Sequence, residues 1–240
     1  MKKSAAIAMI GLAVGLGFTS ARADERAWPW SPLGIGIAAP AQLPFMSSDV
    51  YGIRFGGLFG FNNDVYGIDG GVTELSTGNF AGLQGAAFTW TEGDVYGIQA
   101  AGLANVIGGR MLAIQVGSVN VVWGEAGGLQ AGLVNYDAEF AGVQVGGVIN
   151  WNNAASYGLE VGLINANQDE FTGCALAGLV NYSDKMTGFA CGLVNVSYEF
   201  TGYQLGLVNA CDRMHGVQIG LINLICESKL PAMVIANASF

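Results

Sequence analysis

One unit of about 15 residues is repeated along most of the chain, and this repeat constrains the fold more than any other feature. In most units the core reads glycine, aliphatic, glutamine, apolar, glycine, aliphatic, valine or isoleucine, asparagine, and a polar turn follows. A period this short means that each unit is one small structural element packed against its neighbours. We therefore predict a single repeat domain over residues 49–229. Its twelve units, spaced by 14–16 residues, open at Gly52, Gly67, Gly82, Gly97, Ala113, Gly128, Gly142, Gly158, Gly173, Gly188, Gly202 and Gly216.

Strict alternation over the first six positions of each unit predicts β-strands. Fifteen residues leave no room for a helix and two loops, so the expected fold class is all-β. The second, fourth and sixth positions are mostly aliphatic or alanine, and we interpret them as the buried face. The third position is polar in most units, and we interpret it as a solvent-exposed face available for binding. This third-position column comprises Gln84, Gln99, Gln115, Gln130, Gln144, Glu160, Gln204 and Gln218.

Two architectures fit such strands. In a parallel β-solenoid each unit is one coil, stacked on the previous coil at about 4.8 Å. In a twelve-stranded outer-membrane β-barrel each unit is one strand, and its aliphatic face contacts lipid. The charged share of only 11% and the terminal Phe240 favour the barrel. So do aromatic residues near both strand ends, such as Tyr157 and Trp151.

An asparagine column favours the solenoid. Asparagine closes nine successive units, and in a parallel stack these side chains can form a hydrogen-bonded ladder. In an antiparallel barrel they would alternate between opposite rims. We therefore predict a parallel β-solenoid of about twelve 14–16-residue coils, with the barrel as the alternative, and we place Asn152 in a turn outside the column. The column comprises Asn105, Asn120, Asn135, Asn150, Asn165, Asn181, Asn195, Asn209 and Asn223.

The two ends of the chain differ from the repeat. Lys2 and Lys3, an apolar run and a small-x-small site before Asp24 predict a signal peptide over residues 1–23. Residues 24–48 hold four of the five prolines, and we expect an extended N-terminal cap there. Residues 230–240 are expected to form a C-terminal cap or terminal strand. Removing the leader leaves six basic against 18 acidic residues, a net charge near −12 that repels nucleic acid.

The four cysteines test the stacking, because an exported chain meets an oxidising compartment. Cys174 and Cys191 occupy different positions of neighbouring units, so we expect them to stay unpaired. Cys211 and Cys226 follow their asparagines by two or three residues, in turns that a parallel stack makes neighbours. The prediction is a Cys211–Cys226 disulfide, or at least Cα atoms within bonding reach.

No catalytic set can be assembled from the sequence. His215 is the single histidine, and it occupies a position that other units fill with tyrosine, alanine or threonine. The carboxylate pairs fall in turns, where they are ordinarily solvated. We therefore expect no enzymatic activity, no cofactor and no metal. A glycan or an envelope protein is the kind of partner considered, and membrane association is left open.

The units "GYQLGLVN" (202–209) and "GVQIGLIN" (216–223) resemble the G-V-Q-x-G-L-V-N repeats of uncharacterised bacterial exported and surface proteins. The resemblance covers residues 52–223 and implies an address in the envelope: the periplasm, the outer membrane or the cell surface. It brings no catalytic residues. The expected function is that of a non-enzymatic repeat protein, structural or a binding platform. The alternative is an outer-membrane barrel acting as a pore or passive membrane protein.

Overall fold

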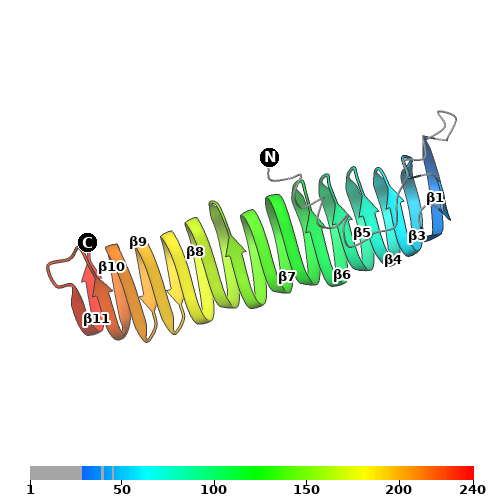
Figure 1. The fold of residues 1–240 in the computed structure, drawn as a ribbon. Coiled ribbons are helices and arrows are strands. Elements are labelled where there is room, and N and C mark those ends of the chain that lie inside the picture. The colour runs from blue at the N-terminus through cyan, green and yellow to red at the C-terminus, as the bar shows by residue number, and fades with distance from the viewer. Residues whose placement is uncertain (1–28, 39–40, 45) are drawn as a thin grey trace, which may run out of the picture.

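The structure is a computed structural model that describes residues 29–38, 41–44 and 46–240, and every regular element in these ranges is a β-strand. The leader and residues 24–28 lie outside the described part. The longest strands bend around several coils without interruption (Figure 1). The strands are β1 (Trp30–Ala38), β2 (Ala41–Leu43), β3 (Asp49–Asn62), β4 (Val65–Ser76), β5 (Phe80–Thr91), β6 (Val95–Ile107), β7 (Met111–Asn152), β8 (Ser156–Cys191), β9 (Val194–Leu205), β10 (Val208–Ile225) and β11 (Ala232–Ser239).

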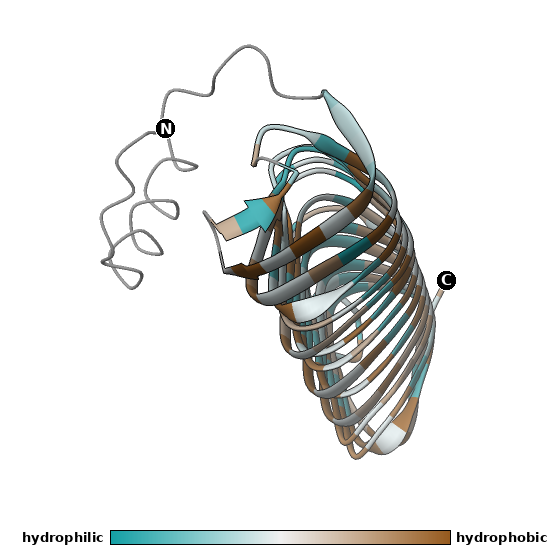
Figure 2. Ribbon diagram, turned by 90° about the vertical axis from the view of Figure 1, so that its right-hand side faces the viewer, coloured by the Kyte–Doolittle hydropathy of each residue, from teal (hydrophilic) through white to brown (hydrophobic). Residues whose placement is uncertain are grey.

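The strands form one sheet that is wound into a parallel β-solenoid. Its order is β11-β10-β9-β8-β7-β6-β5-β4-β3-β1-β2, and each neighbouring pair from β3 to β10 is parallel. Figure 2 looks along the stack and shows coils of similar outline lying behind one another. The predicted solenoid is confirmed. The barrel alternative is wrong, because a barrel of these units would need antiparallel neighbours.

Repeat positions lie directly above one another in the stack. Gly67 pairs with Gly82, Gly82 with Gly97, and Asn105 with Asn120. The units opened by Gly97, Gly142 and Gly173 carry one extra small residue. In the first two, the register shifts between residues 101 and 104 and between 146 and 149. The insertions are thus absorbed as bulges at one corner of the coil, which keeps the rest of each coil aligned.

The glycine that opens a unit is required by the stacking. At Gly158 the backbone φ is +128°, a region that residues with a Cβ rarely adopt. A Cβ added there would lie 2.0 Å from the carbonyl oxygen of Gly142 in the preceding coil. The recurrent opening glycine therefore marks the place where each coil bends against the backbone of the coil before it.

The two ends of the stack are closed by short strands. At the N-terminal end β1 pairs with β3 in parallel as the first layer, and β2 folds back antiparallel to β1. At the C-terminal end β11 pairs antiparallel with β10. The segment predicted as a cap therefore contributes β1 and β2, and the C-terminal segment contributes a terminal strand.

Buried hydrophobic side chains are concentrated in one inward-facing column, two residues before the opening residue of each unit. They form two clusters, one from Val50 to Phe140 and one from Phe171 to Ile225. Ser156 occupies the same column between the two clusters and is also buried. The apolar core is thus narrow, and most other buried positions are polar.

Candidate functional site

The interior of the solenoid is largely polar, which reverses the faces expected from the alternation. Every member of the third-position column is buried, from Gln84 at 3% exposure to Gln218 at 0%. The aliphatic residues on either side of this column point outward. The prediction of a solvent-exposed glutamine face was wrong, and no glycan can be bound by side chains enclosed in this way.

The glutamines of this column form side-chain hydrogen bonds with one another between neighbouring coils. Gln99 donates to Gln84 over 2.6 Å, Gln115 to Gln99 over 2.9 Å, and Gln144 to Gln130 over 2.8 Å. Each amide thus donates toward the N-terminal end of the stack. A buried amide is costly only when it lacks a partner. Because amides recur at this position in five successive coils, from Gln84 to Gln144, these side chains can be buried without that penalty.

The asparagine column forms the predicted ladder. Each side-chain amide donates to the next asparagine over 2.8–2.9 Å, from Asn105 through to Asn223. From Asn105 to Asn209 the same nitrogen also donates to a backbone carbonyl of the next coil over 2.9–3.1 Å. This ladder donates toward the C-terminal end, opposite to the glutamines. The two columns therefore fix the register with opposed amide dipoles.

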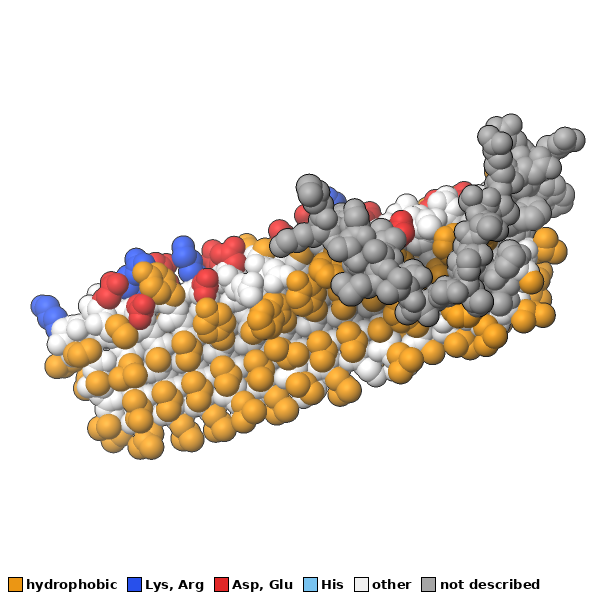
Figure 3. All heavy atoms as spheres, viewed as in Figure 1, with side chains coloured by type: hydrophobic (Ala, Val, Ile, Leu, Met, Phe, Trp, Pro, Cys, Tyr) orange, Lys and Arg blue, Asp and Glu red, His pale blue; other side chains and the backbone are white. Residues whose placement is uncertain are grey.

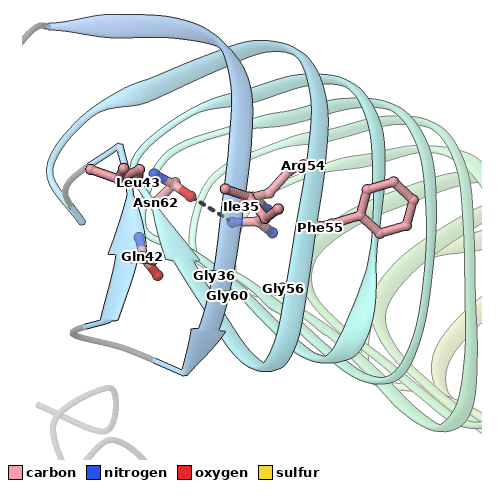
Figure 4. A pocket seen from close by; sticks show the side chains of 9 residues that line it. All are labelled: Ile35, Gly36, Gln42, Leu43, Arg54, Phe55, Gly56, Gly60 and Asn62. Atoms are coloured by element: carbon pink, nitrogen blue, oxygen red, sulfur yellow. Dashed lines mark hydrogen bonds between the residues drawn. The ribbon is translucent and has the colours of Figure 1, made fainter.

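An ionic cluster begins the glutamine column beneath the N-terminal cap. Arg54 is buried and binds Asp69 through two hydrogen bonds of 2.7 and 2.6 Å. Its guanidinium also lies 3.0 Å from a carboxylate oxygen of Glu74. Figure 4 shows Arg54 and its bond to Asn62 at a small pocket lined by β1, β2 and β3. Gln84 then donates to Asp69 over 2.6 Å, so the carboxylate terminates the run of amide donors.

Two more carboxyl groups are enclosed in the middle of the stack. Asp137 accepts hydrogen bonds from Gln130 and Gln144 over 3.0 and 2.5 Å, and burial raises its pKa well above the ordinary value. Glu160 accepts from Asn152 and Asn167 over 2.6 and 3.0 Å, and burial raises its pKa to about 7. These groups lie near the junction of the two apolar clusters, so the middle of the rod encloses carboxyl groups as its N-terminal end does.

The outer surface carries the aliphatic side chains. A row of them occupies the corner between the glutamine and asparagine columns, where exposure reaches 65% at Leu103 and 64% at Leu221. Figure 3 shows apolar side chains in regular rows over the visible face, with acidic and basic groups gathered along the opposite edge. We call this corner row the apolar corner. It comprises Leu58, Val72, Leu103, Leu133, Val148, Leu163, Leu179, Leu193, Leu207 and Leu221.

The opposite edge of each coil is a polar turn, which we call the charged edge. Ionised side chains of neighbouring turns pair along it, as Arg213 does with Glu199 at 2.6 Å and Arg110 with Glu125 at 3.4 Å. Acidic residues predominate there. It holds Asp49, Asp64, Glu92, Asp94, Arg110, Glu125, Glu139, Asp169, Glu170, Asp184, Lys185, Glu199, Asp212, Arg213, Glu227 and Lys229.

The predicted disulfide is absent, although the two turns are neighbours. The backbone N–H of Cys226 donates to the carbonyl of Cys211 over 3.0 Å, yet both thiols are free. The last coil spans 14 residues, so Ile225 rather than Cys226 occupies the position corresponding to Cys211. A one-residue offset turns a side chain to the other face. Cys211 therefore points inward, where burial raises its pKa to about 12, while Cys226 is exposed. Cys174 and Cys191 are also free, as expected.

Asn152 was also misplaced by the sequence interpretation. It is buried inside the coil, where it donates to Glu160 over 2.6 Å and to Asn167 over 3.0 Å. This second inward column, two residues beyond the asparagines, was missed because its members vary from Asp137 to Ser183. Polar residues recur two positions after the asparagine in several units, and this recurrence could have revealed the second inward column.

His215 lies on the exposed side of β10, and its ring contacts Phe240 edge-on with centroids 6.3 Å apart. No acid or nucleophile is hydrogen-bonded to it among the described residues. Within the same residues, no group of three histidine, cysteine or acidic side chains converges as metal ligands do.

Replacing Asn165 with alanine is expected to destabilise the fold by about 1–2 kcal/mol, because it leaves Asn150 without its acceptor and Asn181 without its donor. Gln168→Ala is the matched control, since Gln168 is an exposed amide in the neighbouring turn. Urea unfolding of both variants measures the difference. Equal midpoints for the two would contradict a stabilising ladder.

Among the described residues, none lies in a helix long and apolar enough to cross a membrane. No known protein family, curated protein or solved structure matches this chain. The candidate functional surface is therefore defined by its geometry alone: an aliphatic exterior opposite a charged edge, around an interior of paired polar side chains.

Proposed function

We propose that this chain is an exported, non-enzymatic repeat protein of the bacterial envelope, and that its outer aliphatic surface is a binding platform. The observation that carries the proposal is the reversed distribution of polarity. Leucines such as Leu133 and Leu207 are 55% exposed, whereas the amides of the same coils are enclosed. An exposed apolar surface that continues over many coils is typical of a contact surface.

The interior supports a structural rather than catalytic role. Most of its amide side chains are hydrogen-bonded to one another, as in the ladders of glutamine and asparagine, and they hold the coils in register. The single histidine lies on the outer surface of β10, where its ring contacts Phe240. The export part of the proposal rests on the leader-like sequence of residues 1–23.

Expression of the full chain in a Gram-negative bacterium tests the proposed location in the envelope. We expect a mature protein beginning at Asp24 that is recovered with the envelope after cell breakage, which N-terminal sequencing and fractionation would show. A chain that starts at Asp24 behind a new methionine should stay in the cytosol and serves as the control. Full-length protein in the cytosol with its leader intact would contradict the proposal.

A further inference from the structure

The apolar surface wraps around the coil instead of forming a single flat patch. On one side of the apolar corner lie residues such as Ile53 and Ile98, and on the other side residues such as Val119 and Val196, all of them exposed. A flat partner, or a second copy of the rod, would cover one of these sides and leave the other in water. A fluid apolar medium would cover both sides and the corner together.

Aromatic side chains mark both borders of this surface, next to the charged edge. On one side the border holds Tyr51 and Tyr66, whose rings stack at 5.0 Å. On the other side it holds Tyr136, Trp151 and Tyr182. Tyrosine and tryptophan concentrate where a protein passes from hydrocarbon to water, because their rings are apolar and their tips are polar.

The polar tips of these rings point toward the charged edge. The hydroxyl of Tyr66 donates to Asp64 over 3.4 Å, and that of Tyr182 to Asp184 over 2.7 Å. The indole N–H of Trp151 donates to Asn153 in the turn over 2.9 Å. In each case the partner lies two residues closer to the edge. Both borders are thus oriented as side chains are at a membrane interface.

The apolar surface is shallow enough to fit within one lipid leaflet. From Tyr157 to the corner at Leu163 the chain advances six residues, which is at most about 20 Å of strand. From Leu133 to Tyr136 it advances three residues, or about 10 Å. Half of a bilayer's hydrocarbon core is about 15 Å thick. With both borders at the interface, the shorter side limits the depth of the corner to about 10 Å, so the corner stays within one leaflet.

The backbone also meets the requirement of an apolar environment. Within lipid every N–H and C=O needs an internal partner. In a parallel stack each coil bonds to the coils on both sides, so unpaired backbone edges are confined to the two ends of the rod, at β2 and β11.

We infer that the rod lies in the plane of a membrane and is immersed in one leaflet up to its aromatic borders, with the charged edge in water. This inference rests on the proposed function and names its partner as a lipid surface. The charged edge holds twelve acidic and four basic residues, so it should disfavour anionic headgroups. The lipid chemistry that fits is an uncharged or zwitterionic leaflet.

Flotation of the refolded mature chain with phosphatidylcholine vesicles tests the inference. We expect the protein to float with the vesicles, and less of it to float at low salt when phosphatidylglycerol is added. The triple variant Leu133→Glu, Leu163→Glu, Leu207→Glu should lower the partition coefficient by about a hundredfold or more, since it places charges where the corner enters lipid. Circular dichroism should be unchanged, because these three side chains point out of the fold.

The matched control carries three neutral substitutions on the charged edge, Glu139→Gln, Glu170→Gln and Glu199→Gln, and should float at least as well as the wild type. Depth is read from brominated lipids: tryptophan introduced by Leu163→Trp should be quenched by deeper bromines than the native tryptophans. Equal flotation of the triple variant and wild type would overturn the inference. A wild-type chain that self-associates and ignores vesicles would also overturn it. Neither result touches the envelope address, which leader cleavage and fractionation decide separately.

Discussion

Gly158→Ala is expected to destabilise the solenoid by about 3 kcal/mol or more, a large effect for a single methyl group. The new Cβ would lie 2.0 Å from the carbonyl oxygen of Gly142, and the backbone would have to hold an alanine at a φ of +128°. Relieving the clash requires two coils to separate, which breaks their hydrogen bonds. Thermal and urea unfolding of the variant measure the loss.

Gly85→Ala is the matched control, because Gly85 also lies in a strand but a Cβ added there meets nothing within 4 Å. Its effect should stay within about 0.5–1 kcal/mol and can be favourable, since glycine weakens a strand interior. Similar losses at both glycines would show that the opening position has no special steric role.

Ala113 is the one opening residue of the twelve units that is not glycine. It is not among the residues of positive φ. We interpret the ordinary backbone φ at Ala113 as the local adjustment that lets an alanine stand at this position of the stack.

The period, the parallel stacking and the asparagine ladder could all be predicted from the sequence. Each depends on identical residues at a fixed spacing, and such residues become neighbours in any parallel stack. Asn105 to Asn223 recur without a gap, and a ladder is the arrangement in which this regularity contributes energy at each step. The turns vary more, although in the first coils the side chains of Asp49, Asp64, Asn79 and Asp94 each accept a hydrogen bond from a backbone N–H of the next turn.

The choice of the inward face could not be made by the same reasoning. Alternation shows which residues share a face, but hydropathy places the aliphatic set inside only for a rod surrounded by water. The glutamines are as uniform as the asparagines from Gln84 to Gln144, and that uniformity was the available sign of a paired, enclosed column. Residues on a solvated face are free to vary.

Single-residue offsets limited the remaining predictions. Cys211 and Cys226 lie in adjacent turns, yet a 14-residue coil places them on opposite sides of the strand. Asn152 follows its column by two residues and so returns to the interior. Coil length has to be known for each unit before a pair of side chains can be placed, and bulges at the corner change that length.

Glu160→Gln is expected to stabilise the protein at pH 8 by about 2–3 kcal/mol. Burial raises the pKa of Glu160 from 4.5 to about 7, against the opposing hydrogen bonds from Asn167 and Asn152. Below pH 4.5 the carboxyl group is protonated in both the folded and unfolded chains and costs nothing. Between pH 4.5 and 7 the unfolded chain loses its proton first, so stability falls as the pH rises. Above pH 7 the penalty is complete, and each pKa unit corresponds to about 1.4 kcal/mol.

Glutamine removes the charge while keeping the shape, and it is the residue that most other coils carry at this position. The advantage of the variant should therefore shrink toward zero as the pH is lowered to about 4.5, which urea unfolding across this range would show. Glu139→Gln, at the exposed edge, is the control and should shift stability by no more than about 0.5 kcal/mol at either pH. Asp137, whose pKa is also raised by burial and by the charge of Glu160, should leave a residual pH dependence in the Glu160 variant. A variant no more stable than the wild type at pH 8 would mean that Asn152 and Asn167 already offset the burial of the carboxylate.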